Sequence, residues 1–274
     1  MPDPLLRLAG VGHAFRGGTS DEVRALDGID LEIGAGTFAV VLGTNGSGKS
    51  SLLNVIAGTL ACARGTVWLA GRDITRWPVH RRAALMGRVF QDPFAGTAPD
   101  LSVAENMVLA AQRGRRRGPA RAVGRSRRAV LREDLARLGL SLEDRLDTPV
   151  GLLSGGQRQA VTVLMATQSA PSLLLLDEHT AALDPRSGDQ VVALTREIIA
   201  SRHITTLMVT HVLSQAVQLG DRILLMHRGR IVHDLSGPAR ATLREPDLLQ
   251  MFDELAWAGR LDTETAAMLE RSWI

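Results

Sequence analysis

The segment Gly43-Thr-Asn-Gly-Ser-Gly-Lys-Ser50 decides the fold of this 274-residue chain. It fits the pattern G-x-x-x-x-G-K-[ST] and lies between the apolar run 38–42 and a predicted helix at residues 51–58. Glycine-rich backbone between a strand and a helix lets main-chain N–H groups and the helix N-terminus surround phosphate groups. We therefore predict a phosphate-binding loop within an α/β fold. The alternative is a chance turn rich in glycine and serine.

Lys49 is the only lysine in the sequence, and every other cationic side chain is arginine. A lysine carries a compact charge on a flexible stem, whereas arginine ends in a wide planar fork. A composition that keeps one lysine indicates a site where guanidinium does not fit. In the phosphate loop, Lys49 would reach the β- and γ-phosphates of a nucleotide and Ser50 would bind Mg²⁺.

Four short apolar runs end in polar residues. Such runs between helical stretches are typical of parallel strands that are covered on both faces. Ligands bind beyond the carboxyl ends of such strands, so one shared site is expected there. The runs are 38–42 before Gly43, 88–90 before Gln91, 173–176 before Asp177 and Glu178, and 204–210 before His211.

The flanking segments predict a different arrangement. Residues 5–11, 26–33 and 65–71 read as shorter, partly antiparallel strands, and 223–232 reads as a hairpin that turns at Arg228-Gly229. We expect a single domain at residues 1–274. Its nucleotide-binding core with the antiparallel β subdomain would comprise 1–91 and 155–235, with a helical subdomain at 92–154 and a helical C-terminal tail at 236–274. The two helices predicted in the subdomain span 102–111 and 127–140.

The acidic pair Asp177-Glu178 follows four leucines. One carboxylate at a strand end can hold the magnesium shell, and its neighbour can orient or deprotonate an attacking water. Taken alone, such a pair could also be an ordinary helix N-cap. The phosphate loop favours the catalytic interpretation.

Leu153-Ser-Gly-Gly-Gln157 resembles the LSGGQ signature of the ABC-type ATPases and lies just before the acidic strand, as in that family. Free N–H groups at a small-residue helix start, with the Ser154 hydroxyl, can hold a phosphate. A flexible linker is the alternative. The resemblance implies an α/β P-loop NTPase fold of ABC type, with a mainly parallel core sheet flanked by helices, an antiparallel β subdomain and a helical signature subdomain.

The other elements of that family follow in order along the chain. Gln91 resembles the Q-loop glutamine, Asp184 belongs to the D-loop segment Ala182-Leu-Asp184, and His211 resembles the switch histidine. Phe15 occupies the position of the aromatic residue that stacks on adenine, although core packing is an alternative for it. His179 and Ala181 depart from the family, which commonly has proline and serine there.

The resemblance implies two ATP molecules and Mg²⁺ at a head-to-tail interface between two copies of the chain. The ATP-binding residues would be Phe15, Gly43, Thr44, Asn45, Gly46, Ser47, Gly48, Lys49, Ser50 and Ser51, and the Mg²⁺ residues Ser50, Gln91 and Asp177. The catalytic residues would be Lys49, Gln91, Glu178 and His211, with Ser154, Gly155, Gly156 and Gln157 on the ATP of the partner copy.

Segments 90–99, 151–157 and 177–185 resemble more narrowly the ATPases of a bacterial importer group labelled as tryptophan/tyrosine transporters. That resemblance implies permease subunits and, indirectly, a substrate-binding protein as partners. An exporter subunit or a soluble ABC ATPase without a transport role is the alternative. A nucleic-acid ATPase of this class would need a long coiled coil or two ATPase domains, whereas Lys49 and Ser154 are 105 residues apart and each motif occurs once. We therefore expect no nucleic-acid partner.

Composition and charge set the remaining expectations. With 45% hydrophobic and 22% charged residues the chain is not disordered as a whole, and its net charge of +3 is too small to indicate nucleic acid. The lone Cys62 and the N-terminal Met-Pro-Asp-Pro predict a cytoplasmic protein. The family resemblance implies that it is peripheral on the inner face of the membrane. The arginine-rich segment from Arg113 to Arg128 is either a solvated loop or a contact with anionic lipid.

Overall fold

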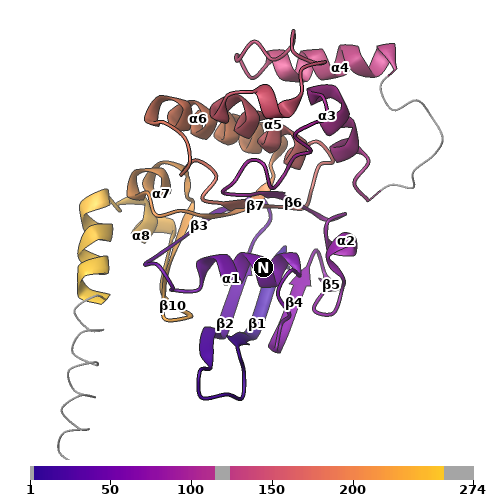
Figure 1. The fold of residues 1–274 in the computed structure, drawn as a ribbon. Helices are drawn as coiled ribbons and strands as arrows, with labels where there is room; N and C mark the ends of the chain where they lie inside the picture. The colour runs from indigo at the N-terminus through magenta and orange to yellow at the C-terminus, as the bar shows by residue number, and fades with distance from the viewer. Residues whose placement is uncertain (1–2, 115–123, 256–274) are drawn as a thin grey trace, which may run out of the picture.

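The computed structural model describes residues 3–114 and 124–255. A six-stranded sheet runs through its centre in the order β10-β9-β3-β8-β7-β6 (Figure 1). The strands are β3 (Phe38–Gly43), β6 (Met86–Val89), β7 (Leu173–Asp177), β8 (Thr205–Val209), β9 (Arg222–His227) and β10 (Arg230–Ser236). The neighbouring pairs from β9 to β6 are parallel, and β10 is antiparallel to β9. The four apolar runs therefore are the predicted parallel strands, and 223–232 is the predicted hairpin.

A second, antiparallel sheet has the order β2-β1-β4-β5. Its strands are β1 (Leu6–Phe15), β2 (Val23–Ile33), β4 (Arg64–Leu69) and β5 (Arg72–Asp73). The antiparallel flank was expected, but β1 and β2 are longer than predicted and β5 was not predicted. The extension of β1 and β2 passes two register shifts in their pairing, at Val11/His13 and His13/Ala14, which hide the alternation of apolar residues.

The helices are α1 (Lys49–Ala57), α2 (Val79–Arg82), α3 (Val103–Ala111), α4 (Arg125–Ala136), the 3₁₀ helix η1 (Val150–Leu152), α5 (Gly155–Thr167), α6 (Pro185–Arg202), α7 (Leu213–Leu219) and α8 (Gly237–Ala241). Residues 245–255 are also helical. The helix predicted at 127–140 is α4, which begins two residues earlier and ends four residues earlier. It ends early because the chain turns at Gly139, whose φ of +63° suits glycine.

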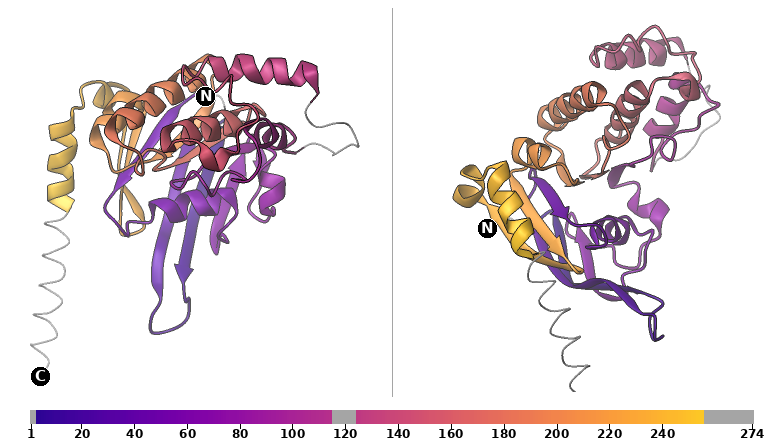
Figure 2. Two further views of the ribbon diagram at one scale, coloured as in Figure 1. Left: turned by 45° about the horizontal axis from the view of Figure 1, so that its top comes forward. Right: turned by 60° about the vertical axis from the view of Figure 1, so that its left-hand side comes forward.

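Alternate side chains of the central sheet enter two hydrophobic cores on its opposite faces. In β3, Val40 and Leu42 belong to the core that contains the helices α3 to α6, whereas Ala39 and Val41 belong to the core that contains α1 and the antiparallel sheet. Figure 2 shows these two layers on either side of the sheet. The six-stranded sheet thus separates α1 from α5. The subdomain boundary proposed at residue 154 stays a prediction. Helix α5, which begins directly after it, packs against α3 and α6 and also against β6.

Candidate active site

The loop between β3 and α1 requires glycine at both ends. A Cβ on Gly43 would lie 2.4 Å from Ser47 Oγ, and one on Gly48 would lie 2.3 Å from the Ala25 carbonyl oxygen. Gly48 is also the N-cap of α1, with φ +101°, and therefore has no side chain to cap the helix. The first turn of α1 carries no acidic residue. Its N–H groups are thus available to an anion, as the sequence predicts.

The Lys49 side chain folds back over this loop. Its Nζ donates to the Gly43 carbonyl at 2.8 Å and to the Thr44 carbonyl at 3.1 Å, and the residue is 6% exposed. Burial lowers the pKa of Lys49, and the charges of Glu178 and Asp177 partly offset this effect. The ammonium group is therefore held where a phosphate can replace carbonyl contacts with a full counter-charge.

Asp177 stands at the carboxyl end of β7, facing the start of α1. Its Oδ1 lies 3.5 Å from Ser50 Oγ, and its Oδ2 accepts a hydrogen bond from Arg88 at 3.2 Å. The N-cap alternative for the acidic pair is wrong, since α6 is capped by Asp184, whose Oδ1 accepts from the Ser187 N–H at 3.1 Å. A hydroxyl and a carboxylate oxygen on the phosphate side suit Mg²⁺, which prefers oxygen ligands and shares substrate phosphates.

No group of three or more His, Cys, Asp or Glu side chains capable of holding a metal ion occurs within residues 3–114 and 124–255. The Ser50–Asp177 pair fits a magnesium ion that takes its other ligands from nucleotide and water. Gln91, the third residue predicted for this ion, is exposed in the loop two positions after β6.

Glu178 adopts an uncommon backbone conformation, with φ +43°. Its N–H donates to the Val209 carbonyl at 2.9 Å, and its Oε2 lies 3.3 Å from Nδ1 of His211. The Glu178 side chain is 19% exposed and that of His211 is 56% exposed. A non-glycine residue in this region costs free energy and persists at functional sites where the surroundings impose it. The structure thus brings together two residues from the ends of β7 and β8 that sequence motifs singled out separately.

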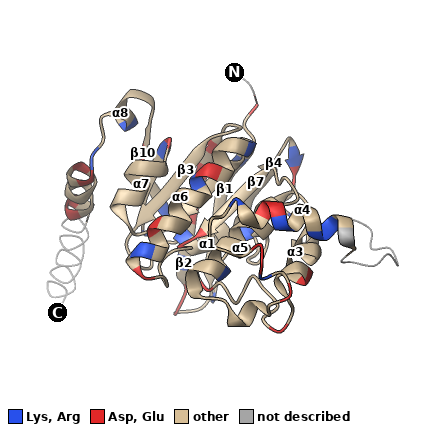
Figure 3. Ribbon diagram, turned by 90° about the horizontal axis from the view of Figure 1, so that it is seen from above, with Lys and Arg blue, Asp and Glu red and all other residues tan. Residues whose placement is uncertain are grey.

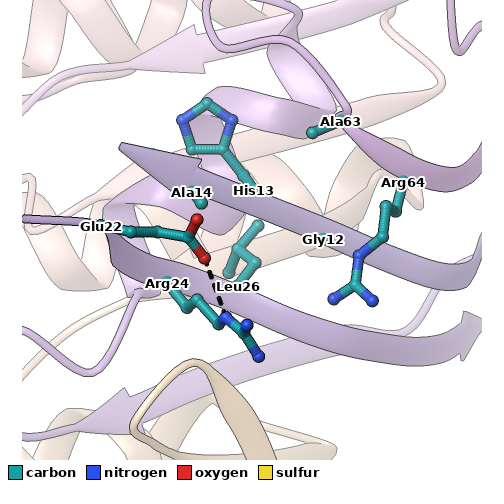
Figure 4. A pocket seen from close by; sticks show the side chains of 8 residues that line it. All are labelled: Gly12, His13, Ala14, Glu22, Arg24, Leu26, Ala63 and Arg64. Carbon is teal, nitrogen blue, oxygen red and sulfur yellow. Dashed lines mark hydrogen bonds and ion pairs between the residues drawn. The ribbon is translucent and has the colours of Figure 1, made fainter. Parts of the chain in front are cut away.

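Phe15 is 43% exposed, so the core-packing alternative for it is wrong. Its ring meets the His13 ring edge-on, with centroids 4.8 Å apart. His13 lines a cavity of about 340 Å³ together with Leu26 and the ion-paired Glu22 and Arg24. Figure 4 shows these side chains. An exposed aromatic ring beside a cavity can stack on a flat ligand.

The signature segment begins α5 on the other face of the sheet. Ser154 Oγ accepts from the Gln157 N–H at 3.3 Å, and Gln157 Oε1 accepts from the Ser154 N–H at 3.3 Å, which closes a capping box. The flexible-linker alternative is therefore wrong. A Cβ on Gly156 would lie 3.0 Å from Ser187 Cβ, so the small residue permits α5 and α6 to begin side by side.

Three residues near Glu178 and Asp177 were not predicted from the motifs. Arg88 holds Asp177, and Gln215 and Thr180 are hydrogen-bonded to each other at 3.0 Å. Arg88 lies in one of the apolar runs that end in a polar residue, a cation inside a buried strand, and that signal could have identified it. The spacing along the sequence gives no signal for the pairing of Thr180 with Gln215, which lie 35 residues apart.

His179, which departs from the family pattern, is 2% exposed. Its Nε2 lies 3.4 Å from Thr195 Oγ1 on α6, and burial lowers the pKa of His179 to about 4. The imidazole is therefore neutral at physiological pH, and it packs the loop after β7 against α6.

The sequence profile of the ABC transporter family matches residues 26–181. The tyrosine transport ATP-binding protein of Clostridioides difficile is 36% identical over 91% of this chain and 99% of its own length. The lipoprotein-releasing system ATP-binding protein LolD 1 of Caulobacter vibrioides is 35% identical, covering 85% of this chain and 97% of its own. The macrolide export ATP-binding/permease protein MacB of Agrobacterium fabrum is 34% identical over 98% of this chain, which spans only 40% of that longer protein.

Among solved structures, the dimeric bacterial ABC transporter cassette MJ0796 superposes with a TM-score of 0.73 at 28% identity, over 84% of this chain and 98% of that one. A post-hydrolysis state of the same cassette, bound to ADP and Pi, matches equally well. The profile, the relatives and the fold agree with one another. This chain belongs to the ABC transporter family, as an ATP-binding subunit with ATPase activity.

Proposed function

We propose that two copies of this chain hydrolyse MgATP at a head-to-tail interface and so drive a small solute, such as an amino acid, through separate permease subunits of a bacterial importer. The observation that carries the proposal is the position of the two phosphate-binding helix starts. Those of α1 and α5 lie on opposite faces of one sheet. A second copy, turned head to tail, is the geometry that lets both starts face one ATP.

Each copy would bind the phosphates of its ATP through the N–H groups of the loop 43–48, through Lys49 and through the first turn of α1. Ser50 and Asp177, with Gln91, would hold Mg²⁺, which when bound neutralises charge on the phosphate oxygens. Glu178 would orient the attacking water and take its proton, while His211 would fix the Glu178 carboxylate from the side. Phe15 would stack on the adenine ring.

The signature of the partner copy would complete the site. Ser154, Gly155 and Gly156 would offer the hydroxyl and N–H groups at the start of α5 to the γ-phosphate, while Gln157 supports Ser154 through the capping box. Asp184 lies beside Glu178 along one cavity of about 260 Å³. That cavity would face the second copy once the interface closes.

The permease would dock on the helical subdomain, around a second cavity. A cavity of about 410 Å³ lies there, lined by Asn106 and Leu109 of α3, Arg113 and Met165, among others. Leu109 is 48% exposed, and Phe94, which precedes the lining residue Gly96 by two positions, is 45% exposed. Exposed apolar side chains around a hollow of this size are typical of surfaces that receive another protein. None of the helices within the described ranges has the length and apolarity that a membrane crossing requires.

In the segment from Arg113 to Arg128, two arginines have surroundings within the chain that compete with a lipid contact. Arg128 pairs with both carboxylate oxygens of Asp147, at 2.8 and 2.5 Å, and Arg113 is partly buried, which lowers its pKa. Figure 3 shows acidic and basic residues together along α4. Residues 115–123 lie outside the described part of the chain. We propose that their arginines meet anionic headgroups on the inner face of the membrane, and loss of salt-sensitive liposome flotation after substitution of 115–117 and 121 by glutamine would support it.

Similarity to MacB and LolD favours a second candidate, an export or release system, and the tyrosine transport relative favours import. Copurification separates these candidates. An importer subunit is expected to copurify with a permease and to respond to a substrate-binding protein, and an export subunit only with a permease. Recovery without any membrane partner would favour a soluble ATPase.

The experiment for the head-to-tail site uses Glu178→Gln, which keeps the side-chain shape and removes the base. This variant is expected to bind MgATP, hydrolyse it very slowly and accumulate as an ATP-dependent dimer in light scattering. Adding Ser154→Arg should return it to monomer, because the larger side chain blocks the γ-phosphate position. A dimer that ignores Ser154→Arg would contradict the composite site. A monomer under all conditions would contradict it for the isolated subunit, and the full transporter then provides the second trial.

A further inference from the structure

A directed chain of hydrogen bonds joins the β7–α6 loop to the β8–α7 loop. The Val212 N–H donates to Thr210 Oγ1 at 3.1 Å, and the Thr210 hydroxyl donates to Gln215 Oε1 at 3.2 Å. The Gln215 amide then donates through Nε2 to Thr180 Oγ1 at 3.0 Å. The Thr210 hydroxyl accepts one hydrogen bond and donates another, and the Gln215 amide accepts through Oε1 and donates through Nε2. Gln215 therefore bridges the two loops with both ends of its side chain.

The bridge spans the segments that carry the two residues of the proposed chemistry. Thr180 lies two positions after Glu178, Thr210 directly precedes His211, and Gln215 is in the first turn of α7. All five line the same cavity of about 260 Å³. Thr180 is 9% and Thr210 is 3% exposed, so water competes little for these hydrogen bonds.

The contact between Glu178 and His211 needs such support. The two side chains meet at 3.3 Å, but His211 is 56% exposed, and exposed pairs of this kind contribute little free energy by themselves. Glu178 also holds an unfavourable backbone conformation at φ +43°. Neither loop is therefore fixed by this pair alone. The partly buried link through Gln215 supplies the second connection between them.

We propose that Gln215 is a positioning residue that sets the distance between Glu178 and His211 for ATP hydrolysis. In this role Gln215 acts through the two loops and not through a contact with the nucleotide. This inference rests on the roles proposed above for Glu178 and His211.

The first test is kinetic. Gln215→Leu keeps the volume and removes both hydrogen bonds, so kcat for ATP hydrolysis is expected to fall roughly ten-fold while the affinity for MgATP stays the same. Thr180→Val should cause the same loss, and Thr180→Ser, which keeps the hydroxyl, should restore it. Gln218→Leu is the matched control, since Gln218 is exposed on the same helix. Equal kcat for Gln215→Leu and Gln218→Leu would overturn the proposal.

The second test distinguishes positioning from a general loss of structure. In single-turnover assays on His211→Ala, adding Gln215→Leu should lower the rate less than two-fold, because the contact it supports is already gone. Losses that multiply would contradict the proposal. If Glu178→Gln and His211→Ala hydrolyse ATP normally, the proposed function of those residues fails. If both are impaired and Gln215→Leu is normal, only the present inference fails.

Discussion

Two helices of this molecule begin in glycine-rich sequence, α1 at the phosphate loop and α5 at the signature. Their first turns differ in side-chain capping. Gly48 caps α1 without a side chain, whereas Ser154 and Gln157 close the start of α5 with a capping box. The N–H groups of α1 therefore await an outside anion. At α5 the capping box occupies the N–H groups of Ser154 and Gln157, and a ligand is left with those of Gly155 and Gly156. The difference fits the proposed division of roles, in which α1 holds the nucleotide of its own chain and α5 completes the site of the partner copy.

We expect the largest effect at Lys49, the first residue of α1, whose start has no side-chain cap. Lys49→Arg is expected to lower ATP hydrolysis roughly 1,000-fold, because a planar guanidinium cannot occupy the place between the Gly43 and Thr44 carbonyls. A phosphate-release assay measures the effect. Turnover close to that of the wild type would refute the special role of the single lysine.

The far end of α1 offers the next largest effect. Arg82 is 2% exposed and donates to the carbonyls of Val55 and Ile56 in the last turn of α1, and to those of Thr75 and Trp77. Arg82→Leu would leave these buried acceptors without a partner and should lower the free energy of unfolding by about 3 kcal/mol. Urea denaturation measures this.

The exposed Arg81, which lies over the Trp77 ring at 3.7 Å, is the matched position for that experiment. Arg81→Leu is expected to cost less than about 1 kcal/mol. Equal losses for the two variants would show that the hydrogen bonds of Arg82 do not stabilise the end of α1.

His179, in the loop between β7 and α6, makes the stability of the protein depend on pH. The folded pKa of about 4 lies below the usual 6.5, so below pH 6.5 the unfolded chain binds a proton that the folded chain excludes. Stability from this residue is complete above pH 6.5 and is lost as the pH falls toward 4, by about 2 kcal/mol at pH 5. Urea denaturation of the wild type and His179→Gln at pH 7 and pH 5 should show this loss only in the wild type.

The smallest effect concerns the cap itself. Ser154→Ala should destabilise the protein by about 1 kcal/mol, because α5 loses its capping hydroxyl. Gly48 has no such side chain to lose, so the α1 start has no counterpart to this variant. Unchanged denaturation of Ser154→Ala would mean that the capping box contributes nothing and that the serine is free for a ligand.

The sequence predicts most of the central sheet because continuous apolar runs must be covered on both faces, and a polar residue after each run marks its carboxyl end. Glu178 and His211 follow two neighbouring parallel strands, so the same pattern predicts that their side chains lie close together. For Phe15 the sequence does not distinguish stacking on a ligand from packing in the core, because one aromatic residue in a strand has no periodicity of its own. Arg82 and Gln215 could not be predicted as supports, since their partners are carbonyls and hydroxyls that only the folded chain brings near.

The solitary Lys49 makes this chain a natural reporter of its own phosphate loop. Apart from the amino terminus, an acylating reagent finds one primary amine, and that amine lies 6% exposed beneath the loop with a pKa lowered by burial. Its labelling rate therefore measures how often the loop opens, without any engineered probe. Protection by nucleotide, read by mass spectrometry of the intact chain, would give occupancy at a single atom.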